Sequence, residues 1–261
     1  MRSGYNRRLP AWPSHRTMAV KRILDIVGSA LGLLLLLPVL VIVAVAIKLD
    51  SPGPIFFRQE RVGLGGGSFR IFKFRSMVVG AARAGTALTV RGDTRITRVG
   101  MFLRSSKLDE LPQLINVLVG DMSIVGPRPE VPEFIKFYTP DQRAIILSMR
   151  PGITDYAAIL FRDESSLLDR ERDPIDVYRR EVMPVKFAYY ERYCREIGAL
   201  NDLRIILATM LLLTVGRVPP RLGIECNLQP PLHRKNEAEA LSRGGRSALD
   251  CASGRNAGRV S

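Results

Sequence analysis

The sequence predicts a mixed α/β fold, mostly helical, of the monotopic membrane class: an N-terminal re-entrant helix-break-helix followed by a cytoplasmic domain of small strands and helices. Three observations indicate this fold class. Residues 26–47 contain no charged side chain, Pro38 interrupts them, and positive charges flank them on both sides. The rest of the 261-residue chain is long enough to bury a substantial core.

The apolar stretch has three interpretations. As a straight helix it would reach roughly 33 Å, enough to cross the hydrocarbon core of a bilayer. Pro38 favours a sharp bend instead, although true spans also tolerate proline. The flanking charges would hold both ends on the cytoplasmic side; they are Arg7, Arg8, Arg16, Lys21, Arg22, Lys48, Arg58 and Arg61. We therefore expect a re-entrant hairpin over residues 18–50, and the length argues against a buried soluble helix.

Composition narrows the chemistry. The net charge of +14 favours anionic partners, but the low aromatic content of 7% and the scattered Lys and Arg argue against nucleic acid. Three cysteines form no metal or redox spacing and suit a reducing compartment. Both histidines lie in terminal regions, which argues against a His-based triad or zinc site. Any catalysis is expected to use carboxylates, Lys, Arg and a hard metal ion.

Two short strands are expected after the apolar stretch, at residues 55–61 and 69–77, where apolar and charged side chains partly alternate. The glycines of residues 63–67 lack the spacing of a nucleotide-binding loop, so a turn between the strands is favoured. Residues 78–98 show no strong period and are expected to form a mobile surface segment.

Three helical regions are expected further along the chain. Residues 132–149 and 174–197 have helical composition, with prolines at positions 140 and 184 as interruptions. Residues 203–215 are too short to span a membrane and form either a core helix or an interfacial helix, which Asn201 and Asp202 could cap. The domains are then a disordered basic leader (1–17), the hairpin (18–50), a cytoplasmic domain with interfacial helices (51–216) and a disordered tail (217–261). Met18 is an alternative start.

The stretch SSKLDELPQLINVLVGDMSIVGPRPE, residues 105–130, carries two adjacent carboxylates, Asp109 and Glu110. Proline is tolerated only in the first turn of a helix, so Pro112 predicts a helix start at residue 108 or 109. Ser106 and Asp109 also resemble a capping box. Both carboxylates would then lie at a positive helix end.

Taken alone, this acidic pair is most simply a helix cap. The surrounding charges favour a phosphate site, namely Arg104, Lys107, Asp121, Arg128 and Arg150. The Gly-Pro-Arg-Pro turn at residues 126–129 would hold the Arg128 guanidinium stiffly enough for a bidentate grip on a phosphoryl group. The alternative is that Arg128 pairs with a local acid, Asp121 or Glu130.

Several ordered motifs carry a family resemblance: KRILDIVGSALGLLLLLPVLVIVAVAIKLDSPGPIFFRQERVG, FKFRSM, LRSSKLDELPQLINVLVGDMSIVGPRPE and RPGIT. From about Val20 to Val215 the chain resembles the bacterial sugar transferases, the monotopic phosphoglycosyl transferases also called polyprenyl-phosphate glycosyl-1-phosphate transferases. This resemblance implies a re-entrant membrane helix bent at Pro38. Many members have Ser before that proline, whereas this chain has Leu37, so the polar contact at the bend is expected to differ.

The resemblance also implies a reaction. A UDP-sugar and polyprenyl (undecaprenyl) phosphate would give a polyprenyl-diphosphate sugar and UMP, with Mg²⁺, as the first step of a surface polysaccharide or glycoconjugate. The enzyme would lie in the bacterial inner membrane, among its lipids, with residues 51–216 as the catalytic domain on the cytoplasmic face. The oligomeric state stays open, a homo-oligomer being one alternative.

Residue roles follow from the same resemblance. Asp109 would be the nucleophile that attacks the β-phosphate and holds a covalent phosphosugar, and Glu110 would place the metal or accept a proton. Both would be metal ligands. The phosphate-binding residues would be Arg104, Arg128 and Arg150, with Lys73 and Arg75 as weaker candidates. Phosphoryl transfer needs an aligned nucleophile, a divalent ion and fixed cations, and two displacements predict ping-pong kinetics.

One segment departs from the family pattern. After RPGIT many members continue Gly-Trp/Leu-Ala-Gln-Val-Asn-Gly, whereas residues 155–169 here are DYAAILFRDESSLLD. This indicates another subgroup and leaves the sugar and the role of residues 155–170 open, although Asp163 and Glu164 could aid a metal. The alternative function is a membrane-tethered scaffold of a glycan-assembly complex that has lost turnover; the intact Asp109–Glu110 pair argues against it.

Overall fold

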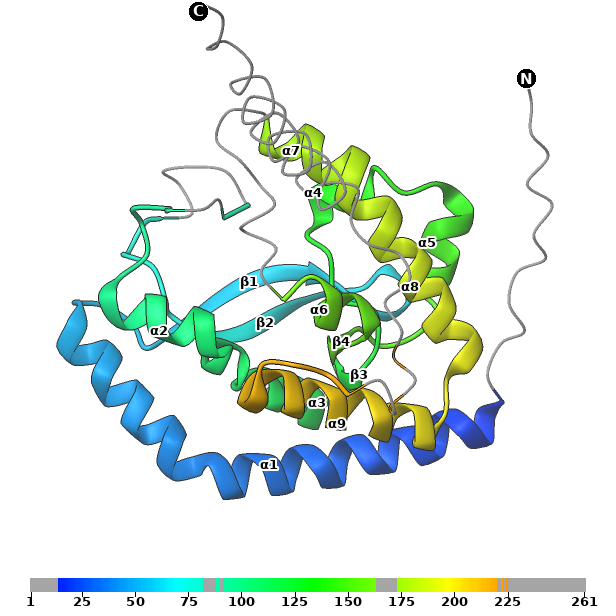
Figure 1. The fold of residues 1–261 in the computed structure, drawn as a ribbon, viewed down its shortest axis with the longest axis horizontal. Coiled ribbons are helices and arrows are strands. Elements are labelled where there is room, and N and C mark those ends of the chain that lie inside the picture. Colours follow the sequence, from blue (N-terminus) through cyan, green and yellow to red (C-terminus); the bar gives the residue numbers. More distant parts are fainter. Residues whose placement is uncertain are drawn as a thin grey trace, which may run out of the picture.

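The computed structural model describes residues 14–81, 88–89, 92–162, 173–219, 222 and 224. One long helix, α1 (His15–Asp50), runs along one side of a mixed α/β domain (Figure 1). Ser14 caps α1, because its side chain accepts the Thr17 N–H at 3.1 Å. Residues 14–17, expected to belong to a disordered leader, thus form the N-cap and first turn of α1, and residues 1–13 lie outside the described part.

Helix α1 is continuous through Pro38 for 36 residues, so the predicted break between two helices is wrong. The predicted change of direction is present, since Figure 1 shows α1 bent along its length. Proline removes one backbone donor without ending the hydrogen-bonded ladder on either side, which permits a bend inside one helix. Among the described helices α1 is the one long and apolar enough to cross a membrane.

Both arms of α1 contact the domain. In the first arm Arg22 donates to the carbonyl oxygens of Val117, at 2.6 Å, and Leu118, at 3.0 Å. In the second arm Val43 and Ile47 are buried in a cluster with Phe74 and Leu103. The two ends of α1 are therefore tied to the same body.

The predicted strand pair is confirmed as an antiparallel hairpin of β1 (Phe56–Val62) and β2 (Ser68–Phe74). The turn holds a 3-10 segment, Leu64–Gly66, in which Gly65 and Gly66 have positive φ angles of 65° and 85°. These conformations favour glycine, so the glycines serve the turn.

After the hairpin come α2 (Arg98–Ser106), a 3-10 turn (Leu108–Glu110) and α3 (Gln113–Val119). A helical turn therefore begins at residue 108 as predicted, but it is a 3-10 turn, and the α-helix itself begins only at Gln113. Lys107 adopts a left-handed conformation with φ of 60°, which separates α2 from the turn. Ser106 still belongs to α2 and its hydroxyl donates to the Phe102 carbonyl at 2.7 Å, so the predicted capping box does not form.

Two short parallel strands, β3 (Ser123–Val125) and β4 (Gly152–Thr154), follow α3 and enclose two helices in sequence. These helices are α4 (Pro132–Ile135) and α5 (Pro140–Ile146). Next come α6 (Tyr156–Leu160), α7 (Pro174–Val177), a π turn (Tyr178–Val182), α8 (Met183–Glu196) and α9 (Ala199–Val215). Pro140 and Pro184 lie in first turns, where proline is tolerated.

Helix α9 packs beside α1 and contributes to the core as one prediction had it, while its interfacial placement stays a prediction (Figure 1). It buries Ile205 and Ala208 in the main core and exposes Leu203, Leu207 and Met210. It also begins earlier than predicted, with Gly198 at its N-cap and no side-chain cap, so Asn201 and Asp202 do not cap it. Instead Asp202 accepts the Lys21 ammonium of α1 at 2.6 Å and the Tyr193 hydroxyl at 2.8 Å.

Two predicted segments are only partly described. In the region of residues 78–98, Met77 and Ile96 form a β-bridge and Asp93 pairs with Arg95. Residues 82–87 and 90–91 lie outside the described part, so the mobility of this segment stays a prediction. The tail expected over residues 217–261 is described only at residues 217–219, 222 and 224.

Candidate active site

The acidic pair lies in the 3-10 turn between α2 and α3. Asp109 is only 6% exposed, and its Oδ1 atom has no hydrogen-bond partner among the described residues. Burial raises the pKa of Asp109, while the positive charges of Lys73, Arg104 and Lys107 oppose that rise. The site therefore holds a poorly solvated carboxylate surrounded by cations.

Glu110 is fixed by two cations. The Lys73 ammonium lies 2.8 Å from Glu110 Oε1. The Arg128 guanidinium grips both carboxylate oxygens, with its Nη1 3.0 Å from Oε2 and its Nη2 bonded to Oε1. Burial favours the neutral acid, but Arg128 and Lys73 outweigh it and hold the pKa of Glu110 well below its usual value. Glu110 is thus a permanent anion between two predicted phosphate-binding residues.

The backbone of the Gly-Pro-Arg-Pro turn is hydrogen-bonded to strand β4, and this contact holds the turn next to Glu110. The Gly126 N–H donates to Thr154 O at 3.0 Å, and the Gly152 N–H donates to Pro127 O at 2.9 Å. The stiff arginine turn is therefore present as predicted. The local partners considered for Arg128, Asp121 and Glu130, are replaced by Glu110, eighteen positions earlier in the sequence.

Asp155 completes this clamp and was missed as a site residue. It is 1% exposed; its Oδ2 accepts the Arg128 N–H at 3.2 Å, and its Oδ1 accepts the Ala158 N–H at 2.5 Å. Burial raises the pKa of Asp155 to about 6 against these two hydrogen bonds. The sequence feature that could have indicated this role is the position of Asp155, directly after a strand and at the N-cap of a helix. Asp163 and Glu164 lie outside the described residues.

The other predicted cations are spread around the turn. Arg104 is close enough to influence Asp109 electrostatically. Arg150 donates to the Gly120 carbonyl at 2.8 Å. Arg75 lies apart from the pair and closes the end of α1, donating to Pro52 O at 2.9 Å and to Ser51 Oγ at 2.8 Å. The structure thus brings Lys73, Arg104 and Arg128 to the acidic pair and gives Arg75 a structural contact.

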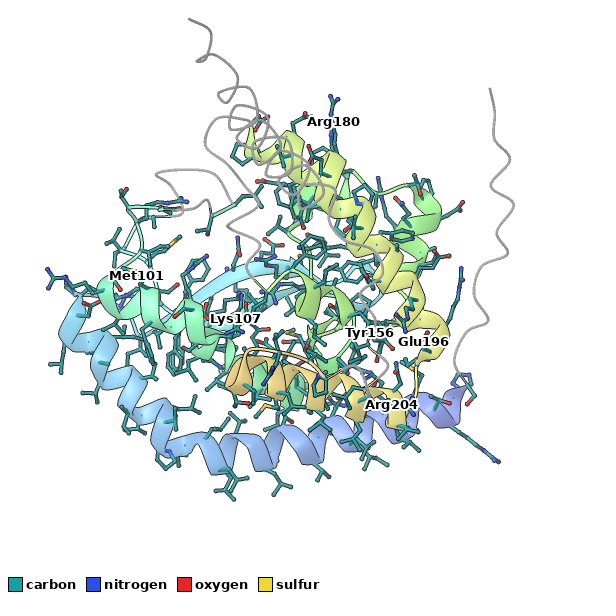
Figure 2. All side chains as sticks on the ribbon, in the orientation of Figure 1. Met101, Lys107, Tyr156, Arg180, Glu196 and Arg204 are labelled. Atoms are coloured by element: carbon teal, nitrogen blue, oxygen red, sulfur yellow. The ribbon has the colours of Figure 1, made fainter. Side chains whose placement is uncertain are left out.

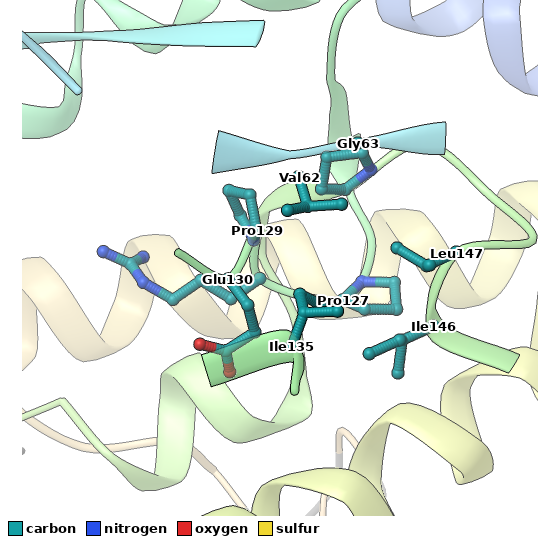
Figure 3. A pocket seen from close by; sticks show the side chains of 10 residues that line it. Val62, Gly63, Pro127, Pro129, Glu130, Ile135, Ile146 and Leu147 are labelled. Atoms are coloured by element: carbon teal, nitrogen blue, oxygen red, sulfur yellow. The ribbon is translucent and has the colours of Figure 1, made fainter. Parts of the chain in front are cut away.

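Behind the turn lies a small cavity of about 10 Å³, lined by Val62, Gly63, Pro127–Glu130, Ile135, Ile146, Leu147 and Pro151 (Figure 3). It is too small for a nucleotide. Glu130 points away from the acidic pair into the core, where it accepts the hydroxyls of Tyr138 at 3.0 Å and Tyr178 at 3.1 Å. Arg61, predicted as a charge flanking the membrane segment, instead supports the turn through Pro129 O at 3.0 Å.

A divalent ion could be held here only with help from substrate. Among the described residues there is no group of three or more His, Cys, Asp and Glu side chains suited to a metal. Asp109 Oδ1 offers one buried, unpartnered oxygen, whereas both Glu110 oxygens already face cations. Mg²⁺ is often bound by one or two carboxylates together with water and substrate phosphates, and this donor set fits that mode.

Comparison with known proteins gives a consistent assignment. The family model described as bacterial sugar transferase matches residues 16–216. The exopolysaccharide production protein PSS of Rhizobium leguminosarum bv. phaseoli is 51% identical over 209 residues, covering 74% of this chain and 94% of that protein. The UDP-glucose:undecaprenyl-phosphate glucose-1-phosphate transferase of Escherichia coli (strain K12) is 40% identical over 194 residues, covering 73% of this chain and 39% of that protein.

A protein of the same name from Caulobacter vibrioides is 48% identical over 141 residues, covering 53% of each chain. This chain thus spans about half or less of the length of these two named transferases. The family match nevertheless runs through α1, the acidic pair, the arginine turn and α9 as one continuous region. The chain belongs to the bacterial sugar transferase family.

Proposed function

We propose that this protein transfers a sugar-1-phosphate from a UDP-sugar to polyprenyl (undecaprenyl) phosphate, giving a polyprenyl-diphosphate sugar and UMP. The observation that carries the proposal is Asp109, a buried carboxylate with an unpartnered oxygen beside the cation-held Glu110. The names of the relatives from E. coli and Caulobacter, which act on UDP-glucose and undecaprenyl phosphate, support the same substrate classes.

In the first displacement a carboxylate oxygen of Asp109 attacks the β-phosphorus of the UDP-sugar. The new bond joins Asp109 to the phosphoryl group, the bond to the oxygen bridging both phosphates breaks, and UMP leaves with that oxygen. A buried carboxylate oxygen that has no hydrogen-bond partner among the described residues, as Asp109 Oδ1 has none, is poorly solvated, which favours nucleophilic attack. Lys73, Arg104 and Lys107 oppose the rise in the pKa of Asp109 that burial causes, and their positive charges would stabilise the phosphates.

In the second displacement a phosphate oxygen of the lipid attacks the same phosphorus. The Asp109–phosphoryl bond breaks and the free carboxylate is restored. Glu110 is a weak base because of its low pKa. Its contribution is therefore to hold Arg128 and Lys73 in place, and a lipid phosphate that has already lost its second proton needs no base.

Mg²⁺, when bound, would neutralise phosphate charge and align the leaving oxygen. Asp109 Oδ1 is the protein oxygen available to it, because both oxygens of the neighbouring Glu110 are engaged by Arg128 and Lys73.

The surface of α1 supports a re-entrant placement in the bacterial inner membrane, with the catalytic domain on the cytoplasmic face. Apolar side chains are exposed along both arms, at Ile23, Leu24, Val27, Leu31, Leu34, Leu35, Leu37, Val41, Ile42 and Val45. Both ends of the same helix are hydrogen-bonded to the domain, at Asp25 with the Ile124 N–H and at Asp50 with the Val99 N–H. A helix anchored at both ends to one body fits insertion into one leaflet better than a crossing.

Intact-mass measurement of the protein mixed with a panel of UDP-sugars tests the transfer. The native chain should gain one phosphosugar with the correct donor and release UMP, whereas Asp109→Asn should do neither. Asp141→Asn, which changes an exposed aspartate of α5, is the matched control and should behave as the native chain. The proposal fails if no donor in a broad panel gives an adduct or UMP.

A further inference from the structure

One edge of strand β2 is paired by a side chain instead of by a third strand. Strand β1 pairs with β2 along one edge, and the Asn116 amide of α3 meets the other. Asn116 Oδ1 accepts the Phe72 N–H at 2.8 Å, and Asn116 Nδ2 donates to Arg70 O at 3.0 Å. A carboxamide presents a donor and an acceptor side by side, as a peptide group does, so Asn116 takes the place of a neighbouring strand backbone.

The orientation of this amide is fixed by a third partner. The second Nδ2 hydrogen of Asn116 goes to Asp121 Oδ2 at 3.1 Å. Turning the amide over would set Nδ2 against the Phe72 N–H and Oδ1 against two acceptors, so only one orientation satisfies all three bonds. Asn116 is fully buried, and its own carbonyl accepts the N–H groups of Gly120, Asp121 and Met122 at 3.1, 3.0 and 3.1 Å. Asp121, expected beside phosphate from the charge pattern, thus serves to orient Asn116.

The same helical segment contacts β2 at a second point. Asn116 lies six positions after Glu110, in α3, which directly follows the 3-10 turn that holds the acidic pair. The Lys73 ammonium of β2 lies 2.8 Å from Glu110 Oε1. Phe72 directly precedes Lys73, so the two contacts fall on neighbouring residues of β2. Together they fix how far β2 lies along the helical segment, and therefore where Lys73 stands relative to the acids.

Lys73 needs this support because its charge is held in a mostly buried place. Its side chain is 17% exposed, and burial lowers the pKa of Lys73 while the charges of Glu110 and Asp109 oppose that change. Val117 and Ile71 pack in one apolar cluster beside the amide, but apolar contacts are not directional and do not set a register. The amide bonds do. A misplacement of about 1 Å at a reacting centre can cost about a hundredfold in rate.

We propose that Asn116 is a positioning residue of the transfer reaction, which fixes β2 against α3 so that the Lys73 ammonium reaches Glu110 and the phosphates next to Asp109. The polar side-chain atoms of Asn116 are engaged by β2 and Asp121, so it acts on substrate only through Lys73. The catalytic consequence rests on the proposed function, whereas the contact itself can be measured without turnover.

The reactivity of lysine side chains tests the contact directly. The full-length protein in neutral detergent is treated with formaldehyde and cyanoborohydride, and methylation of each lysine is followed by peptide mass spectrometry. Asn116→Leu keeps the shape of the side chain and removes the amide. In this variant Lys73 should react about tenfold faster than in the native chain, the loss of one to two net hydrogen bonds. Lys21 and Lys186, which are buried elsewhere in the domain, should react as before, because a general loosening would expose all three lysines.

UMP release gives the catalytic readout. Asn116→Leu and Lys73→Met should each slow it about a hundredfold. The double variant should be no slower than Lys73→Met, because the effect of Asn116 passes through Lys73, whereas a purely structural role would multiply the two losses. Asn201→Leu is the matched control. The Asn201 amide accepts the hydroxyl of Tyr156, which Figure 2 shows apart from Lys107 beside the acidic pair, so this variant should match the native chain in both readouts.

Unchanged Lys73 reactivity in Asn116→Leu, an equal rise at the other two buried lysines, or multiplied losses in the double variant would each overturn the proposal. If Asn116→Leu does not fold by circular dichroism, Asn116→Asp replaces it and should give the same rise at Lys73. That variant keeps an acceptor for the Phe72 N–H but sets an oxygen against Arg70 O. If the native chain releases no UMP with any donor, the proposed reaction fails, and lysine reactivity still decides whether Asn116 positions Lys73.

Discussion

At the scale of single residues, the site depends on which acid Arg128 meets. A bidentate Arg–carboxylate pair fixes both partners in orientation as well as distance. Because Glu110 occupies the guanidinium in this way, Arg128 and Lys73 are already oriented before any substrate enters. Asp109, beside them, keeps one oxygen that has no hydrogen-bond partner within the described part of the chain. One carboxylate thus organises the cations and the other is left available for reaction.

Asp155 gives a residue-scale prediction in the dependence of stability on pH. Its pKa of about 6 in the folded state lies above the ordinary aspartate pKa of 3.8, so between these values the folded state holds a proton that the unfolded state has lost. Stability from this group is therefore full below pH 3.8 and is lost as the pH rises through 6, by about 3 kcal/mol. Asp155→Asn should remove this fall, measured as a smaller drop in melting temperature between pH 4.5 and 7.5.

The same variant also loses one hydrogen-bond acceptor, because an Asn oxygen can serve the Arg128 or the Ala158 N–H but not both. Asp155→Asn should therefore melt at a lower temperature than the native chain at pH 4.5, where the native Asp155 is protonated. Asp141→Asn, at an exposed position, is the control for the charge change itself. An unchanged pH dependence in Asp155→Asn would contradict the assigned burial effect.

What the sequence could predict at this scale was residue type. Asp109, Glu110 and Arg128 were marked by the local charge pattern, Lys73 was implied by the family resemblance, and the structure brings the four together. The partner of Arg128 and the role of Asp155 were not predictable. Both depend on β3 and β4 pairing across more than twenty residues, and no local pattern marks two strands of three residues each.

At the scale of elements, two glycines that approach each other closely hold the arginine turn: Gly126, directly after β3, and Gly152, the first residue of β4. A Cβ built on Gly152 would lie 2.1 Å from Gly126 N and 2.4 Å from Gly126 O, both backbone atoms that cannot rotate away. Gly152→Ala should therefore push the turn off Glu110, lower stability by about 3 kcal/mol and stop UMP release. Melting temperature and UMP release measure the two effects.

Gly198→Ala is the matched control, since a Cβ there would meet nothing within 4 Å. Its φ of 172° is extended backbone that alanine also adopts, so the variant should melt and react as the native chain. If Gly152→Ala were equally silent, the strand pair would not hold the turn.

Element boundaries show where local pattern is enough. The hairpin of β1 and β2 was predicted because alternation and a glycine-rich turn are both local signals. The predicted start at residue 108 coincides with a 3-10 turn that directly follows the left-handed Lys107, whereas α3 begins at Gln113; no local pattern distinguishes such a turn from the first turn of an α-helix. Likewise Pro38 predicted a bend in α1 but not whether the helix would continue through it, since continuity depends on the domain contacts of both arms.

At the scale of the whole molecule, α1 is a bent helix tied to one domain at both ends, and this geometry predicts that its ends lie on the same side of the membrane. Single cysteines replacing Arg16, near the start of α1, and Pro54, just after its end, test this prediction, because both positions are exposed. In this background Cys226 and Cys251 are changed to Ser, and Cys194 is kept because it is buried. A thiol reagent that cannot cross the membrane should label both sites in inside-out vesicles and neither site in right-side-out vesicles. A cysteine replacing Asp141, an exposed residue of the domain, should show the same labelling pattern. Labelling of the two positions from opposite sides would mean that α1 crosses the bilayer, which is incompatible with both arms contacting one domain.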